Sequence, residues 1–202
     1  DVLVTGFEGL QLFRNQGDGT FIEQADQAGL GERRWSTVAA IADLNGDTHP
    51  DIFVSRYTEF EIGKFPPCPL PGDEKARSSC SPSLFAGQDD SLYLSRGDGS
   101  FHDVTTQWEL SKAGRGLGTL IADFDQDGDL DVYVANDTER NFLYRNDDQK
   151  KLTELAVRAG AATDERGVVQ GSMGVALGDM DNNTQFDLFV TNFERELPAL
   201  YM

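Results

Sequence analysis

The sequence predicts an all-β fold, and three observations carry this prediction. Three segments repeat one pattern of oxygen-bearing side chains, each segment runs into three apolar residues, and short strand signals joined by turns follow further along. A unit of about four short strands that recurs at about 50 residues is typical of a β-propeller blade. We therefore expect a segment of a β-propeller with four-stranded antiparallel blades, of which two are complete and two are partial.

The repeated acidic segments begin at Asp43, Asp123 and Asp179. Each offers carboxylate or amide oxygens at positions 1, 3, 5 and 9, and the backbone carbonyl of position 7 is expected to add one more. Calcium takes about six to eight oxygen ligands, so each loop predicts a calcium site. The predicted ligands are Asp43, Asn45, Asp47, His49 and Asp51 in the first loop, Asp123, Asp125, Asp127, Asp129 and Asp131 in the second, and Asp179, Asp181, Asn183, Gln185 and Asp187 in the third.

Two other interpretations of these loops are possible. An EF-hand needs a glutamate at position 12, but Val54, Val134 and Val190 occupy that position. Aspartate, asparagine and glycine also form ordinary turns between strands. Because the whole pattern recurs three times in front of a strand, calcium binding is the favoured interpretation.

The loops differ in charge and in turn residues. The Asp123 loop has carboxylates at all four side-chain ligand positions, whereas Asn45 and Asn183 each replace one with an amide. More ligand charge tightens calcium binding, so the Asp123 loop is expected to bind most tightly. Thr48 and Thr184 stand at position 6, and they must avoid positive φ or be strained in reaching it.

The apolar run after each loop is expected to form a strand buried on both faces. Gly17-Asp18-Gly19 and Gly97-Asp98-Gly99 then predict hairpins, although the third repeat lacks these glycines. Asp1 precedes Val2-Leu3-Val4 as the ninth loop residue precedes its strand elsewhere, so Asp1 is predicted to be the closing calcium ligand of a further loop. We expect the chain to be part of a longer propeller, with units at residues 1–30, 36–110, 115–162 and 170–202.

Cys68 and Cys80 are the two cysteines of the chain, and both lie in a proline-rich insertion at about residues 58–88. We predict a disulfide between them, since such a segment lacks a core of its own. Two unpaired thiols or half of a metal site are the alternatives. A disulfide together with calcium loops indicates an oxidising compartment.

The charge of the chain bears on its partners. It has 17 basic and 35 acidic residues, for a net charge of −18, which argues against a nucleic-acid partner. Much of this acidity supplies the loops. Neither a membrane span nor a signal peptide is found.

The residues of two loops, Ala42 to Asp47 and Ala122 to Asp131, resemble FG-GAP/VCBS repeats, the calcium-bearing blades of integrin α-subunit propellers. The wider sequence, including Asp90-Ser91-Leu92-Tyr93-Leu94 and Val134-Ala135-Asn136-Asp137-Thr138, is similar to bacterial relatives of cartilage acidic protein, the ASPIC-type proteins. This resemblance implies a role in extracellular or envelope interactions.

We expect a recognition, adhesion or assembly module rather than an enzyme. The histidines, His49 and His102, have neither a nucleophile nor a second histidine nearby in the sequence. The expected partners are calcium ions, another protein or an extracellular polymer, and the remaining blades or a neighbouring chain; the expected location is extracellular, on the cell surface or periplasmic. A calcium-dependent enzyme such as a polysaccharide lyase, with its active site outside this segment, and a structural subunit of an envelope assembly are the alternatives.

Overall fold

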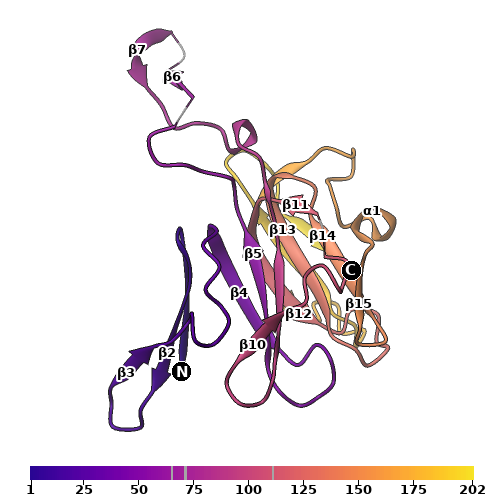
Figure 1. Cartoon of the computed structure of the whole chain (residues 1–202). Helices are drawn as coiled ribbons and strands as arrows, with labels where there is room; N and C mark the ends of the chain where they lie inside the picture. Colours follow the sequence, from indigo (N-terminus) through magenta and orange to yellow (C-terminus); the bar gives the residue numbers. More distant parts are fainter. Residues whose placement is uncertain (65, 71, 111) are drawn as a thin grey trace.

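The computed structural model describes residues 1–64, 66–70, 72–110 and 112–202, and antiparallel strands dominate these ranges (Figure 1). The helical elements of this part are a short helix, α1 (Ala156–Ala159), and a 3-10 turn, η1 (Pro82–Leu84). The predicted all-β, antiparallel fold is confirmed.

The first two sheets share a hairpin of one design. The first sheet has the order β1-β2-β3, and the second has the order β10-β9-β5-β4. The hairpins that join β2 to β3 and β9 to β10 each have two glycines at positive φ. In each hairpin the aspartate between the glycines accepts a hydrogen bond from the backbone N–H two residues later. The glycine-based hairpins were therefore predicted correctly. The strands are β1 (Val2–Gly6), β2 (Gly9–Asn15), β3 (Phe21–Glu23), β4 (Ser36–Ala42), β5 (Asp51–Arg56), β9 (Ser91–Ser95) and β10 (Phe101–Asp103).

The third and fourth sheets are joined by backbone pairing. Strand β13 runs past the end of β12 and pairs with β16 through Asp137 and Gly171. The third hairpin, without glycines, turns on Asp148 and Gln149, which both have φ of 57°. The strands are β12 (Gly116–Ala122), β13 (Asp131–Glu139), β14 (Phe142–Asp147), β15 (Lys151–Glu154), β16 (Gln170–Gly178), β17 (Asp187–Asn192) and β18 (Ala199–Tyr201).

The same kind of junction recurs between successive sheets. The strand that follows the ninth loop position, β1, β5 or β13, lies against the strand that precedes the next acidic loop, β4, β12 or β16. The Thr5 hydroxyl donates to the Thr37 carbonyl at 2.9 Å, and the Thr37 hydroxyl donates to the Gly116 carbonyl at 2.6 Å. A Cβ on Gly118 would stand 2.4 Å from the Met173 carbonyl oxygen, so glycine is needed for this close approach.

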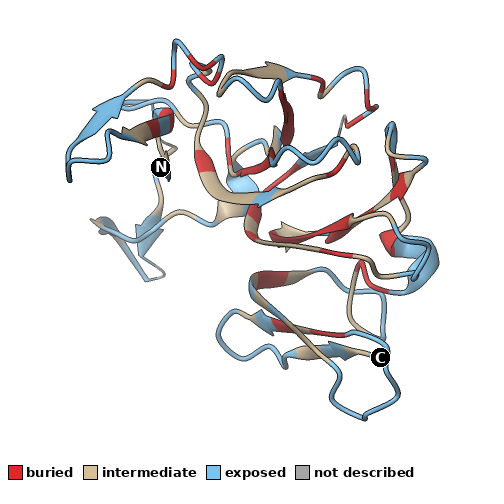
Figure 2. Ribbon diagram, turned by 90° about the horizontal axis from the view of Figure 1, so that it is seen from below, coloured by how far each residue is buried: buried red, intermediate tan, exposed pale blue. Residues whose placement is uncertain are grey.

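The hydrophobic core lies between the sheets (Figure 2). In β5, Ile52 and Val54 pack toward the first sheet, whereas Phe53 packs toward the third. Alternate residues of a strand point to opposite faces, so three consecutive apolar residues are buried on both sides. Tyr133 of β13 packs toward the fourth sheet while its neighbours face the second. Strands β5 and β13 are thus buried on both faces, as predicted, whereas in β17 Leu188 and Val190 are buried and Phe189 is only half-buried.

The insertion between β5 and β9 forms an arm on a paired base. The arm holds β6 (Pro69–Leu70) and β7 (Asp73–Arg77), and it projects from one end of the molecule (Figure 1). Residues 65 and 71 of the predicted insertion lie outside the described residues. At the base, Thr58 bridges to Gly87, and β8 (Gln88–Asp89) pairs with β11 (Ala113–Gly114) of the next unit.

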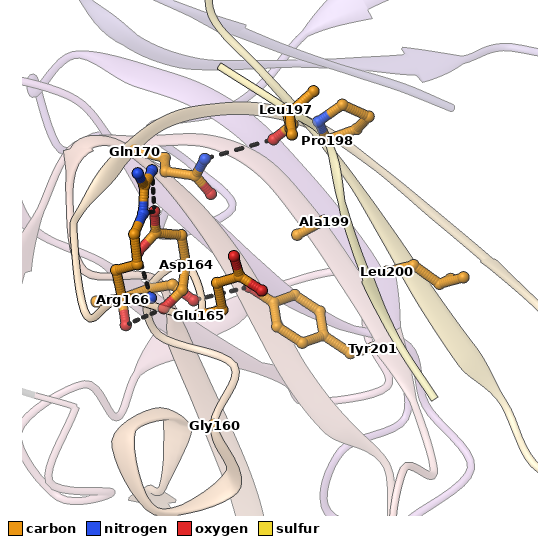
Figure 3. A pocket seen from close by; sticks show the side chains of 11 residues that line it. Gly160, Asp164, Glu165, Arg166, Gln170, Leu197, Pro198, Ala199, Leu200 and Tyr201 are labelled. Carbon is orange, nitrogen blue, oxygen red and sulfur yellow. Dashed lines mark hydrogen bonds and ion pairs between the residues drawn. The ribbon is translucent and has the colours of Figure 1, made fainter.

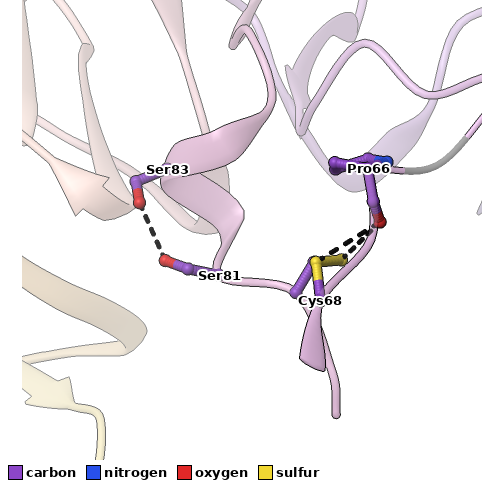
Figure 4. The surroundings of a disulfide bond; sticks show 5 residues. Pro66, Cys68, Ser81 and Ser83 are labelled. Atoms are coloured by element: carbon purple, nitrogen blue, oxygen red, sulfur yellow. Dashed lines mark hydrogen bonds between the residues drawn. A yellow bond between two sulfur atoms is a disulfide. The ribbon is translucent and has the colours of Figure 1, made fainter. Parts of the chain in front are cut away.

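Cys68 and Cys80 form a disulfide with a Cα–Cα distance of 5.3 Å, which confirms the predicted bridge (Figure 4). Reduction, or a double Cys68→Ser, Cys80→Ser variant, is expected to loosen the arm and leave the sheets intact, because the paired base holds the arm independently. Limited proteolysis should cut the variant within residues 58–88 at least about tenfold faster, while its melting temperature shifts by less than about 4 °C. A collapse of the melting temperature would show that the bridge supports the core.

A polar network is buried between the first and second sheets. Arg56 is fully buried and donates to Ser36 Oγ at 2.6 Å, to a Glu32 carboxylate oxygen at 3.0 Å and to the Tyr93 hydroxyl at 3.2 Å. Asp90 is also fully buried: its Oδ1 accepts a hydrogen bond from the backbone N–H of Arg56 at 3.0 Å, and its Oδ2 has no hydrogen-bond partner. Burial raises the pKa of Asp90 to about 7, although Arg56 and Arg34 act in the opposite direction.

This pKa makes the stability depend on pH. The folded state holds the Asp90 proton more tightly than the unfolded chain, so stability falls as pH rises from about 4 to about 7. Asp90→Asn is expected to flatten this dependence by roughly 3 kcal/mol between about pH 5 and pH 8, because the amide keeps the acceptor for the Arg56 backbone N–H and cannot ionise. Urea unfolding at about pH 5 and pH 8 in saturating calcium would measure it. Parallel pH profiles for the two proteins would contradict the expectation.

Candidate metal centres

The acidic loops follow β4, β12 and β16, and the ninth residue of each loop closes it. Asp51, Asp131 and Asp187 are almost fully buried. In each, Oδ2 accepts a hydrogen bond from the backbone N–H of the second loop residue, at 3.0 Å from Leu44, 2.9 Å from Phe124 and 2.6 Å from Met180. The buried carboxylate therefore joins the beginning of the loop to the strand that follows it.

The first loop residue organises the turn. Asp43 accepts hydrogen bonds from the backbone N–H groups of Gly46, Asp47 and Thr48, at 2.7–3.1 Å. Asp123 and Asp179 each accept from the N–H groups of positions 5 and 6 in the same way. These donors hold the aspartate oxygens in a fixed orientation toward the loop interior.

Positions 4 and 6 of every loop have positive φ. Thr48 has φ of 73° and Thr184 has φ of 70°, where the second loop has Gly128 at 99°. Of the two outcomes expected for these threonines, the structure shows the strained one. A β-branched residue in this region costs on the order of 1–2 kcal/mol, which the loop hydrogen bonds offset.

Two groups of three carboxylates in the described residues could hold a metal ion. One oxygen each from Asp123, Asp125 and Asp131 lies within 4.8 Å of the others, and the same holds for Asp179, Asp181 and Asp187. The first loop has an amide at position 3, and Asn45 donates to a carboxylate oxygen of Asp47 at 2.9 Å. Asn183 makes the corresponding contact with Asp181 at 3.1 Å.

The electrostatics of the loops favour a cation. Burial, followed by the negative charges of Asp125 and Asp127, raises the pKa of Asp131 to about 6. Burial, with a contribution from Asp47 and Asp43, also raises the pKa of Asp51. A divalent cation would stabilise the charged forms of these groups, and clustered carboxylates are ligands that hard cations prefer. The donor set therefore fits calcium.

Asp1 makes the same kind of backbone hydrogen bond as the ninth residues of the first two loops. Its Oδ1 accepts the Asn15 N–H at 2.9 Å, as Asp51 accepts from Ser95 and Asp131 from Asn146, both also at 2.9 Å. Its second oxygen pairs with Arg14 at 2.9 Å. In Asp187 the corresponding Oδ1 is buried without a hydrogen-bond partner among the described residues.

The position-seven residues differ in what their side chains contact. The Asp129 carboxylate accepts a hydrogen bond from Gln149 Nε2 at 2.6 Å, and His49 Nδ1 lies 3.2 Å from Asp47 Oδ1. Gln185 is exposed, and its backbone N–H donates to Asn183 Oδ1 at 2.7 Å. We had not anticipated that Gln149, in the third hairpin, reaches Asp129 and also lies against Gly46 of the first loop.

A model of the FG-GAP-like repeat matches residues 1–54, 83–134 and 123–190. The chain belongs to the FG-GAP-like repeat family. The matched ranges contain all three acidic loops and leave out most of the insertion, so the arm is an addition to the FG-GAP pattern. Among curated proteins, none was found to match the chain.

The FG-GAP repeats are typical of extracellular domains, and the disulfide fits an oxidising environment. No helix in the described residues has the length and apolar character to cross a membrane.

A cavity of about 400 Å³ lies beside β18, between the segment around Asp164 and the residues before Tyr201 (Figure 3). Arg166 pairs with Asp164 at 3.0 Å across its wall, and the Tyr201 hydroxyl donates to the Thr163 carbonyl at 3.5 Å. Gln170 donates to the Leu197 carbonyl at 3.4 Å, and the acidic loops do not line the cavity.

Proposed function

We propose that the chain is a segment of a calcium-binding FG-GAP β-propeller that acts as a recognition, adhesion or assembly module outside the cytoplasm. The observation that carries this proposal is the threefold recurrence of one acidic loop with one buried closing carboxylate. Loops that only turned the chain would have no need to gather three carboxylates within 4.8 Å, as the second and third loops do.

The propeller arrangement is supported by the repeated junction between sheets. When each sheet packs on the next with the same geometry, successive sheets are arranged radially around one axis. This is the arrangement of the blades of a propeller. Val2 and Val4 at one end of the series and Leu200 at the other are 40–47% exposed. Further blades, or a neighbouring chain, would cover these apolar residues.

Calcium would serve each loop in two ways. It neutralises the clustered carboxylates, and it holds the strand before the loop to the strand after it, because its ligands come from both ends of the loop. The Asp123 loop, with carboxylates at all four side-chain ligand positions, would bind most tightly. In this proposal His49, Asp129 and Gln185 contribute their backbone carbonyls.

The proposed role is binding and not catalysis. The similarity to ASPIC-type proteins supports a partner in the extracellular space or the cell envelope, either another protein or an extracellular polymer. The negative charge of the chain, −18 before ions are bound, disfavours nucleic acid as that partner.

Calcium stoichiometry tests the proposal. Calorimetric titration of the chelator-treated protein is expected to reveal three calcium ions per chain, with the Asp123 loop filled first. An Asp123→Asn, Asp125→Asn double variant should bind two ions and lose the tightest class of site. Absence of calcium binding at concentrations of about 10 mM, well above the range of extracellular modules, would contradict the proposal.

A further inference from the structure

A cavity of about 430 Å³ lies at the base of the insertion, away from the acidic loops. Trp35, in its wall, directly precedes β4, whereas the first acidic loop follows the other end of that strand. Three separate segments form the wall: the turn between β1 and β2, the residues before β4, and both sides of the insertion base.

Three aromatic rings line this cavity. Phe7, Trp35 and Phe60 lie with their ring centroids 5.4–5.6 Å apart and their planes inclined at 67–85°. Edge-to-face packing of this kind is favourable and fixes the rings. Each ring remains partly exposed, in contrast to Trp108, which is 2% exposed in the core. The cluster therefore joins the sheets and still presents aromatic surface to the cavity.

Planar polar groups stand beside the rings. The Gln88 Oε1 atom is buried and has no hydrogen-bond partner, although the Gln88 side chain lines the cavity. Glu8 and the exposed Arg33 add a carboxylate and a guanidinium to the same wall. A buried acceptor without a donor costs about 1–3 kcal/mol, so a ligand hydroxyl that the Gln88 amide turns to meet would relieve this cost.

We propose that this cavity binds a pyranose ring of a saccharide. A pyranose has faces of C–H groups, which pack on aromatic rings, and an edge of hydroxyls, which bond to amide, carboxylate and guanidinium groups. The cavity volume lies within the range of small-molecule sites, at about 300–1,000 Å³. This inference rests on the proposed recognition role and names the class of molecule recognised.

The two tryptophans permit a site-specific test on the calcium-loaded protein. Indole N–H resonances of Trp35 and Trp108 would be followed during titration with methyl glucoside, cellobiose, N-acetylglucosamine and galacturonate. We expect at least one saccharide to shift the Trp35 resonance saturably, with a Kd on the order of 1 mM, while Trp108 stays unchanged. The neutral sugars and galacturonate distinguish a neutral ligand from an acidic one.

Matched variants complete the test. Gln88→Leu removes the unpartnered acceptor and is expected to weaken binding at least about tenfold. Gln107→Leu, at an exposed glutamine next to Trp108, should bind as the parent protein does. No Trp35 shift with any of these sugars up to about 50 mM, equal shifts of both indoles, or a shift with aromatic peptides alone would overturn the proposal. Three bound calcium ions together with no saccharide shift would overturn the pyranose site alone and leave the calcium proposal standing.

Discussion

Removal of calcium is expected to lower the melting temperature by roughly 10–30 °C. A ligand that binds the folded state stabilises it by about 1.4 kcal/mol at tenfold, and about 2.7 kcal/mol at 100-fold, excess over its Kd. Three such sites together contribute roughly 4–8 kcal/mol, and each kcal/mol shifts the melting temperature of a chain of this size by about 2–4 °C. Calorimetry of one preparation in millimolar calcium and in chelator measures the difference.

Magnesium at equal ionic strength is the control for this experiment. It is smaller and demands a stricter octahedral geometry, so it should recover only a small part of the lost stability. Equal melting temperatures in calcium and in chelator would mean that the acidic loops fold without an ion, and the calcium proposal would fail.

Asp131→Ala is expected to give the largest effect of a single substitution. Its carboxylate is 1% exposed and accepts the backbone N–H groups of Phe124 and Asn146, both at 2.9 Å. Its loss leaves two donors unpaired at about 1–3 kcal/mol each, so we expect a destabilisation of roughly 2–5 kcal/mol even in chelator. The variant should also bind one calcium ion fewer. Urea unfolding with and without calcium separates the two contributions.

Asp129→Asn is the matched comparison. Asp129 lies two positions earlier in the same loop, is partly exposed, and is proposed to use its backbone carbonyl. Its variant keeps an oxygen acceptor for Gln149, so it should retain all three ions and lose less than about 1 kcal/mol. If Asp131→Ala kept the full calcium stoichiometry, the ninth position would have a structural role alone.

The sequence was informative wherever structure depends on neighbouring residues. The apolar triplet Ile52-Phe53-Val54 correctly indicated a strand buried on both faces, and the glycines around Asp18 and Asp98 correctly indicated hairpins. Cys68 and Cys80, twelve positions apart, pair as expected. Each of these features is determined by periodicity, by turn chemistry or by a short loop, and all of them are visible in one sequence.

Contacts between distant segments could not be predicted in this way. The network of Arg56 and Asp90 joins residues 34 positions apart, and Gln149 reaches Asp129 from another hairpin. The aromatic cavity needs Phe7, Trp35 and Phe60 from three segments that no local pattern relates. The strained Thr48 shows the same limit, because the surrounding hydrogen bonds impose a conformation that its own preference opposes.

The pairing of β13 with β16 has a consequence for how the molecule opens. Backbone hydrogen bonds there connect two sheets into one ladder, while the first two sheets are joined by the Thr5 hydroxyl at the Thr37 carbonyl and, outside any ladder, by the Phe101 N–H at the Ala28 carbonyl. Residues in one ladder exchange their amide hydrogens as a cooperative unit. The C-terminal half should therefore open as a single body under mechanical load, and the seam between β1 and β4 should part first.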